Sequence, residues 1–216
     1  MLEEILGALY VHILLTYISL FLSIIIGIPL AVISLKNRYL ASVIIGFCNL
    51  IQAIPSFAVV AIVVPLFGIG FKPAILAIFI RILMPIVKNT YDGLTNIDNL
   101  LLDSSKGIGL SEWQILRYIR FPNSYPSIFA GIKFAAILSN SVAILTAIIG
   151  SGGLGSIIFE GLASFNINKI LYGSIPTILI ALFMDISFSI IEYKFFTYPD
   201  IVNKNQPSQK LLDKIF

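Results

Sequence analysis

The chain has 216 residues, of which 58% are apolar and only 12% are charged. Soluble domains carry about 25% charged residues, so this composition excludes an ordinary soluble protein and indicates a membrane protein. The net charge of +3 is too small to favour nucleic-acid binding, and the single cysteine, Cys48, excludes a disulfide framework and is expected to be a small buried apolar residue.

The N-terminal segment is acidic, and the apolar run behind it is long. Glu3 and Glu4 stand where a signal peptide would carry basic residues, and the run exceeds the apolar core of a signal sequence. We therefore expect a retained membrane helix over residues 9–35, closed by Lys36 and Arg38.

Four further stretches are long and apolar enough for membrane spans, since about 20 apolar residues cross the hydrocarbon core. They cover residues 39–67, 73–91, 127–149 and 170–193. Pro55 and Pro65 are expected to break or kink the first of these four. The sequence thus predicts an all-α, polytopic membrane protein with about five transmembrane helices. A break at Pro55, or re-entry of residues 150–165 into the membrane, would make the count four or six.

Basic residues gather in loops on one side of these spans, which sets the orientation by the positive-inside rule. They are Lys36, Arg38, Lys88, Lys106, Arg117, Arg120, Lys194, Lys204, Lys210 and Lys214. The other side carries only Lys72 and Lys169. The bias predicts a multi-pass protein of the cell (inner) membrane with its N-terminus outside and its C-terminus in the cytoplasm. The membrane domain is expected over residues 1–197, followed by a short polar tail over 198–216.

A polar, amphipathic block over residues 103–122 interrupts the apolar spans. Asp98 is a plausible N-cap for a helix over 99–106, and Gly107 and Gly109 are expected to end that helix in a left-handed turn. The orientation places the block in the cytoplasm, where a simple connector would need only a few residues. The length and character of the block indicate a docking partner outside the membrane.

A second short helix is expected over residues 112–120. Ser111, three residues before Gln114, forms the sequence pattern of a capping box, and Phe121 with Pro122 is expected to stop the helix. Trp113, Leu116 and Arg120 fall near one face, and Ile115 and Ile119 fall near another. Two short helices around a glycine turn would form a rigid knob on the membrane domain.

This block resembles the EAA loop of bacterial ABC importer permeases, in which Glu-Ala-Ala is followed at fixed spacing by Gly, Ile and Pro. Gly109, Ile119 and Pro122 match outright, Asp103 stands for Glu, Ser104 and Ser105 replace the alanines, and Phe121 replaces Leu. The resemblance implies a type I importer fold with a cytoplasmic coupling loop over 95–124. It also implies that Asp103, Ser104, Ser105, Gly109, Ile119 and Pro122 couple the chain to a separate ATPase subunit.

Other segments resemble permeases for glycine betaine, carnitine and choline. They are Gln52–Ser56 (Q-x-I-P-S), Gly68–Gly70 with Pro73–Ile75 (G-I-G-x-x-P-A-I), Lys88–Leu94 (R-N-T-Y-x-G-L, with Lys for Arg) and Ile149–Gly155 (I-G-A-G-G-L-G). The glycine segment also resembles that of methionine-type importers. The first and third segments together favour the quaternary-amine branch.

Several of these residues are candidates for the solute pathway or its gate. A break at Pro55 would free a carbonyl beside Gln52 and Ser56, although a simple packed kink is an equal alternative. Asn89 and Tyr91 belong to the third segment of the resemblance. Gly152 and Gly153 lie in a run that lacks the Lys-Ser/Thr ending of a phosphate-binding loop, so we expect a sharp turn near an outer gate instead.

Three ionisable residues fall inside predicted spans: Arg81, Lys133 and Asp185. Such groups are costly in lipid and usually face protein or water, so Arg81 or Lys133 is expected to pair with Asp185 or to reach an interface. His12 is expected to be a packed or interfacial residue rather than a ligand or proton relay.

The resemblance implies a permease subunit of an ATP-driven importer for compatible solutes, without cofactor, metal or catalytic residues of its own. Its expected partners are ABC ATPase subunits, an extracytoplasmic substrate-binding protein, and a second copy or a paralogue. A permease for methionine, another amino acid or a related betaine is an alternative in the same class. An ion-coupled secondary transporter is the alternative from a different class. This alternative predicts an internal repeat and paired acidic residues inside the membrane, whereas only one acidic residue, Asp185, lies deep in a span.

Overall fold

The structure, a computed structural model, describes residues 2–196, which form helices and connecting turns without a strand. The first half contains α1 (Leu2–Ser34), α2 (Arg38–Ala53), α3 (Ser56–Phe67) and α4 (Phe71–Thr95). Two short helices follow, α5 (Asn99–Gly107) and α6 (Glu112–Ile115). A π-helical turn, η1 (Leu116–Arg120), leads into α7 (Phe121–Thr146), a 3-10 turn, η2 (Ala147–Ile149), α8 (Leu154–Ala163) and α9 (Ile167–Phe196). The predicted tail over 198–216 lies outside the described residues.

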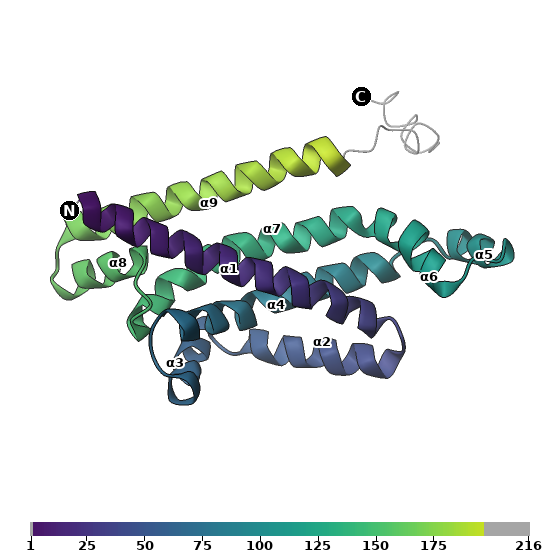
Figure 1. The fold of residues 1–216 in the computed structure, drawn as a ribbon, viewed down its shortest axis with the longest axis horizontal. Helices are drawn as coiled ribbons and strands as arrows, with labels where there is room; N and C mark the ends of the chain where they lie inside the picture. Colours follow the sequence, from purple (N-terminus) through teal and green to yellow (C-terminus); the bar gives the residue numbers. More distant parts are fainter. Residues whose placement is uncertain (1, 197–216) are drawn as a thin grey trace, which may run out of the picture.

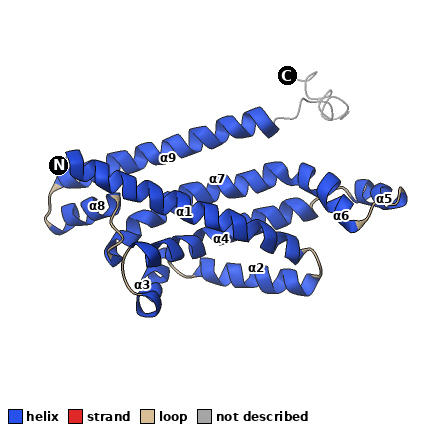
Figure 2. Ribbon diagram, viewed as in Figure 1, coloured by secondary structure: helices blue, strands red, loops and turns tan. Residues whose placement is uncertain are grey.

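Helix α4 lies in the middle of the bundle, packed most extensively against α7 and α1. Helices α9, α7, α4 and α2 follow one another, and α1 lies across the seam between α4 and α7 (Figure 1). The start of α1 lies with α3 and α8 at one end of the long axis. The short helices α5 and α6 project from the opposite end, beyond α4 and α7 (Figure 2).

Three helical stretches are long and apolar enough to cross a membrane: α1, residues 112–149 and residues 167–192. Helices α2 and α3 together form a fourth candidate, bent by 101°. These four match four of the five predicted spans. Helix α4, with 25 residues, matches the fifth in position and is not among the stretches that qualify. The all-α fold is confirmed, and the count of five stays a prediction.

The predicted break at Pro55 is confirmed. Proline has no backbone N–H and disfavours helical geometry in the residue before it. Ile54 accordingly has an extended backbone, with φ −75° and ψ 129°, and α2 ends there. Pro65, also a candidate for a break, lies inside α3, which continues to Phe67.

The predicted stop at Phe121 and Pro122 is wrong. The chain passes from α6 through η1 directly into α7, so helical structure is continuous from residue 112 to residue 149. Pro122 lies in the first turn of α7, and the wider π-helical turn before it interrupts the usual hydrogen-bond register. The span predicted over 127–149 therefore begins earlier and is joined to the polar block.

Small residues let α4 and α7 approach closely. A methyl group at Gly131 of α7 would lie 2.7 Å from Cβ of Asn89, and one at Gly93 of α4 would lie 2.7 Å from Cβ of Ser127. Such contacts drive helix association in lipid, where burying apolar surface gives no advantage. The main hydrophobic core also includes residues of α4, namely Ile78, Ile82 and Ile86.

Candidate functional site

The polar block forms two short helices whose N-termini are capped as predicted. The carboxylate of Asp98 accepts a hydrogen bond from the backbone N–H of Leu100, and α5 begins at the next residue after the cap. Ser111 and Gln114 form a reciprocal capping box at the start of α6. Each cap satisfies backbone donors that the first helical turn leaves unpaired.

A left-handed residue sets the angle between the two short helices. Gly109 has φ +84°, a conformation that strains any residue with a Cβ. Gly107, the other glycine expected in the turn, is instead the last residue of α5 and has no positive φ. A small apolar cluster of Ile97, Leu102 and Ile115, with Leu110 and Ile119 packed against it, then holds the helices together. We call residues 98–120 the coupling knob.

The coupling knob is attached to the membrane helices at two points. Its last turn runs without a break into α7, and the guanidinium of Arg120 donates a hydrogen bond to the carbonyl of Leu94 near the end of α4. Ile119 packs inward on the apolar cluster, and Pro122 lies just past the knob in α7. A displacement of the knob must therefore move the ends of both α4 and α7.

The outer surface of the coupling knob exposes both polar and large apolar side chains. Asp103 and Ser104 are exposed on α5, whereas Ser105 is buried and its hydroxyl donates to the carbonyl of Leu101. Large apolar side chains are exposed beside them: Leu100, Ile108, Trp113 and Tyr118. Exposed apolar patches of this kind are typical of protein-docking surfaces, and this one lies at the end of the bundle away from α3 and α8.

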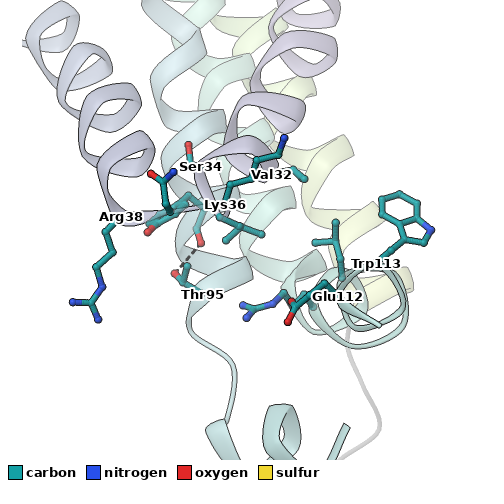
Figure 3. A pocket seen from close by; sticks show the side chains of 12 residues that line it. Val32, Ser34, Lys36, Arg38, Thr95, Glu112 and Trp113 are labelled. Carbon is teal, nitrogen blue, oxygen red and sulfur yellow. Dashed lines mark hydrogen bonds between the residues drawn. The ribbon is translucent and has the colours of Figure 1, made fainter. Parts of the chain in front are cut away.

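A cavity of about 750 Å³ lies between part of the coupling knob and the bundle. Its walls come from the turn between α1 and α2, the end of α4, and α6 with η1. Figure 3 shows Glu112 and Trp113 on one side of this cavity and Arg38 extending away from them. Tyr91 and Arg38 also line a second, wide-open cavity of about 490 Å³ beside α2.

Arg81 of α4 forms hydrogen bonds to the backbone carbonyls at the C-terminus of α2, next to the break at Pro55. One guanidinium nitrogen, Nη1, donates to the carbonyls of Ile51, Gln52 and Ile54 at 3.2, 3.2 and 3.3 Å. In return, the side-chain amide of Gln52 donates to the carbonyl of Arg81 at 2.7 Å. The Ile51 carbonyl also accepts from the backbone N–H of Ile54 at 3.3 Å, and a cation beside the last carbonyls of a helix is favourable. Arg81 therefore stabilises the break instead of pairing with Asp185.

Lys133 is the partner of Asp185. Its ammonium group lies 3.1 Å from the Asp185 carboxylate and donates to the Ser189 hydroxyl at 2.9 Å, which joins α7 to α9. Half of the Asp185 side chain is exposed. This pair confirms one of the two alternatives expected for Asp185.

The glycine segment forms a sharp turn at the end of the bundle opposite the coupling knob. Gly152 and Gly153 have φ +77° and +79°, and the turn packs against Val11 and His12. His12 is fully buried and hydrogen-bonded to Asn140 at 3.0 Å, so it is a packed residue, as expected. The turn connects η2 to α8, which is too short to span a membrane.

The remaining candidate pathway residues separate into two groups. Asn89 donates a hydrogen bond to the carbonyl of Pro85 in its own helix and packs against Gly131, so it lies in the α4–α7 contact. Tyr91 faces the two cavities, and Ser56 begins α3 directly after Pro55. Among residues 2–196 there is no group of three or more His, Cys, Asp or Glu side chains suited to a metal.

Comparison with known proteins assigns residues 23–196 to the family described as binding-protein-dependent transport system inner membrane component. The carnitine transport permease protein OpuCB of Listeria monocytogenes is 34% identical over 85% of this chain and 84% of its own length. The choline transport system permease protein OpuBB of Bacillus subtilis is 37% identical over 88% of each chain. The osmoprotectant import permease protein OsmW of Salmonella typhimurium is 36% identical over 81% and 83%.

Solved structures share the fold. A chain of the MetNI methionine ABC transporter in an inward-facing conformation superposes with a TM-score of 0.82 at 18% identity, over 88% of this chain and 95% of its own. A chain of an amino acid ABC transporter, solved with histidines, has a TM-score of 0.77 at 13% identity, over 89% and 94%. At these identities the likeness concerns the fold alone.

Proposed function

The chain belongs to the family of binding-protein-dependent transport system inner membrane components, and we propose that it imports quaternary-amine compatible solutes such as glycine betaine, choline and carnitine. The observation that supports this substrate class is the likeness to permeases for carnitine, choline and osmoprotectants, which extends over more than four fifths of the chain. The chain is a transport component, and ATP hydrolysis is assigned to a separate ATPase subunit.

The ATPase docks on the coupling knob. Asp103 and Ser104 present polar groups on α5, while the exposed rings of Trp113 and Tyr118 offer apolar contact area next to them. Ser105, Gly109, Ile119 and Pro122 set the shape of the knob and its connection to α7 instead of touching the partner. The Arg120 contact with Leu94 then transmits the movement of the knob to α4 as well as α7.

The solute pathway forms between two permease subunits, either two copies of this chain or one copy and a paralogue. The break at Pro55, with Gln52 and Ser56 beside it, faces this pathway, as does Tyr91. We assign Asn89 to the packing of α4 against α7 because both of its contacts lie there. The polar bond network around Arg81 supports this placement, because ionisable groups inside membranes face protein or water.

The end of the bundle with α8 and the glycine turn lies outside the cytoplasm, where a substrate-binding protein docks. Gly152 and Gly153 then belong to the outer gate, and the N-terminus is extracytoplasmic. The basic residues at the opposite end, on the turn between α1 and α2 and on the coupling knob, support this orientation.

Uptake by the reconstituted complex, with its ATPase and its binding protein, tests the substrate class. Radiolabelled glycine betaine should accumulate, and unlabelled choline or carnitine in excess should reduce that accumulation. Methionine and histidine serve as controls and should not compete. Accumulation of methionine in place of glycine betaine would contradict the proposal and favour the amino-acid alternative.

A further inference from the structure

Two rows of side chains with different chemistry run along the surface of α2. One row is apolar and exposed, and consists of Tyr39, Val43, Phe47 and Leu50. The other row is polar or small and consists of Arg38, Ser42, Gly46 and Asn49. Both rows have the spacing of four, four and three residues that keeps side chains on one face of a helix. Helix α2 is therefore amphipathic although it lies in the membrane domain.

The polar row lines the cavity of about 490 Å³ together with Tyr91 of α4. Ser42 and Asn49 are exposed, and within residues 2–196 their side chains make no hydrogen bond or ion pair. A Cβ at Gly46 would meet no atom within 4 Å, so the centre of the row is open. The cavity thus presents polar groups that nothing in the described chain satisfies.

The position of Asn49 decides which row faces lipid. Asn49 follows Arg38 by 11 residues, which places it about 16 Å farther along the helix. An amide without a partner is costly in hydrocarbon at that depth, whereas the rings and aliphatic chains of the other row are compatible with lipid. The polar row must therefore face water or a polar surface, and the apolar row faces the bilayer.

The chemistry of the cavity suits a zwitterion with a quaternary ammonium group. The ring of Tyr91, which packs on Ala31, Cys48 and Val87 and also lines the cavity, can receive a trimethylammonium group, which needs no hydrogen-bond acceptor. The Asn49 amide and the Ser42 hydroxyl supply neutral dipoles, and the lining contains no acidic residue. Arg38, the single charged residue of the lining, lies in the first turn of α2 and can attract a carboxylate.

We propose that the polar row of α2 and Tyr91 line the cytoplasmic half of the solute pathway and form a subsite for zwitterionic quaternary amines. The ammonium group lies on the Tyr91 ring, and the carboxylate is directed toward Arg38. This inference rests on the proposed import of quaternary amines and adds the residues that would contact the solute. Ser42, Gly46 and Asn49 carry no such role in the motifs recognised from the sequence.

Thiol labelling of the whole complex tests the placement of the two rows. Asn49→Cys and Phe47→Cys are compared in a Cys48→Ala background, which removes the single native cysteine. A thiol reagent that carries a trimethylammonium group is added to the cytoplasmic face of inside-out vesicles. Asn49→Cys should react at least about tenfold faster than Phe47→Cys, because a charged reagent does not enter lipid. Glycine betaine should slow only the Asn49→Cys reaction.

Other labelling results would overturn the proposal. Equal rates at the two positions, or no reaction at either, would mean that the polar row does not face an aqueous pathway. Fast labelling of Asn49→Cys that glycine betaine leaves unchanged would place the row in water but remove the subsite. The labelling rates do not depend on which solute the importer carries; only the protection by glycine betaine does.

Uptake kinetics of variants test the subsite separately. Tyr91→Phe keeps the aromatic ring, so its KM for glycine betaine should stay within about threefold of the wild-type value. Tyr91→Leu lacks the ring and should raise this KM by about tenfold. Arg38→Gln should reduce glycine betaine uptake more than choline uptake, because choline has no carboxylate; Lys36→Gln, outside this cavity, is the matched control. The subsite would be overturned if Tyr91→Leu had the wild-type KM for glycine betaine, or if Tyr91→Phe and Tyr91→Leu raised that KM equally. Failure of the wild-type complex to import any quaternary amine would instead overturn the proposed function.

Discussion

At the residue scale, the charged groups inside the bundle are held by contacts between helices. Arg81 satisfies three carbonyls at the end of α2, and Lys133 pairs with Asp185 across α7 and α9. An ionisable group in a membrane domain usually marks protein or water rather than lipid, and both residues follow that rule. Their roles differ, since Arg81 maintains a helix break whereas Lys133 joins two intact helices.

Replacement of Arg81 should destabilise the protein. Arg81→Met leaves the part-buried carbonyls of Gln52 and Ile54 without this donor, whereas the Ile51 carbonyl keeps the backbone N–H of Ile54; an acceptor left unpaired costs about 1 kcal/mol or more. We expect a loss of about 2 kcal/mol, measured as a lower midpoint of thermal unfolding of the purified complex. Lys72→Met, on an exposed side chain of the same helix, is the control and should unfold like the wild type. An Arg81→Met protein as stable as the control would contradict the role of Arg81 at the break.

The ion pair between α7 and α9 predicts a specific pattern of stability. Lys133→Met leaves the Asp185 carboxylate unpaired, and Asp185→Leu leaves the ammonium group with only Ser189. The double variant removes both charges and should be more stable than either single variant, because neutral side chains need no partner. Thermal unfolding of the three variants measures this coupling. Additive losses in the double variant would show that the pair does not interact.

At the element scale, the coupling knob shows which local structures the sequence predicts. The caps at Asp98 and Ser111 depend on residues within three positions, so both short helices were predictable. The stop expected at Pro122 was wrong because a proline in the first turn of a helix costs no hydrogen bond, and the preceding π-helical turn has no marker in the sequence.

Contacts between distant elements were less predictable than the elements themselves. The break at Pro55 follows from proline chemistry, but its partner Arg81 lies 26 residues later, and no local pattern links them. The polar row of α2 has a helical spacing that sequence periodicity can reveal, yet its importance depends on the cavity that it lines with Tyr91. The fold and the coupling knob were therefore predictable, whereas the proposed placement of the pathway depends on the packing of α2 on α4.

Two glycines of the coupling knob provide a matched pair of variants. Gly109 and Gly107 both lie in open space, but only Gly109 has a positive φ. Gly109→Ala should strain the turn by about 1 kcal/mol or more and change the angle between α5 and α6, whereas Gly107→Ala should be neutral. We expect Gly109→Ala to lower solute transport per ATP hydrolysed, measured in proteoliposomes, with Gly107→Ala at the wild-type ratio. The same ratio in both variants would mean that the turn geometry is not used in coupling.

At the scale of the whole molecule, the arrangement connects two distant ends of the bundle. The coupling knob extends from one end, and the glycine turn and α8 lie at the other (Figure 1). Helix α7 runs between them and packs against α4 along its length, so a displacement of the knob is carried by two closely packed helices. Close packing through Gly93 and Gly131 leaves little room for α4 and α7 to slide independently. In the proposed function, this closely packed pair links the ATPase-docking end of the bundle to the end that carries the glycine turn.

The energy source of uptake tests the central claim most directly. The complete complex is reconstituted into liposomes with ATP inside, where the ATPase faces, and with the binding protein outside, and glycine betaine uptake is measured without any ion gradient. We expect accumulation that requires both ATP and the binding protein. Uptake that an ion gradient drives without ATP would contradict the account and favour a secondary transporter.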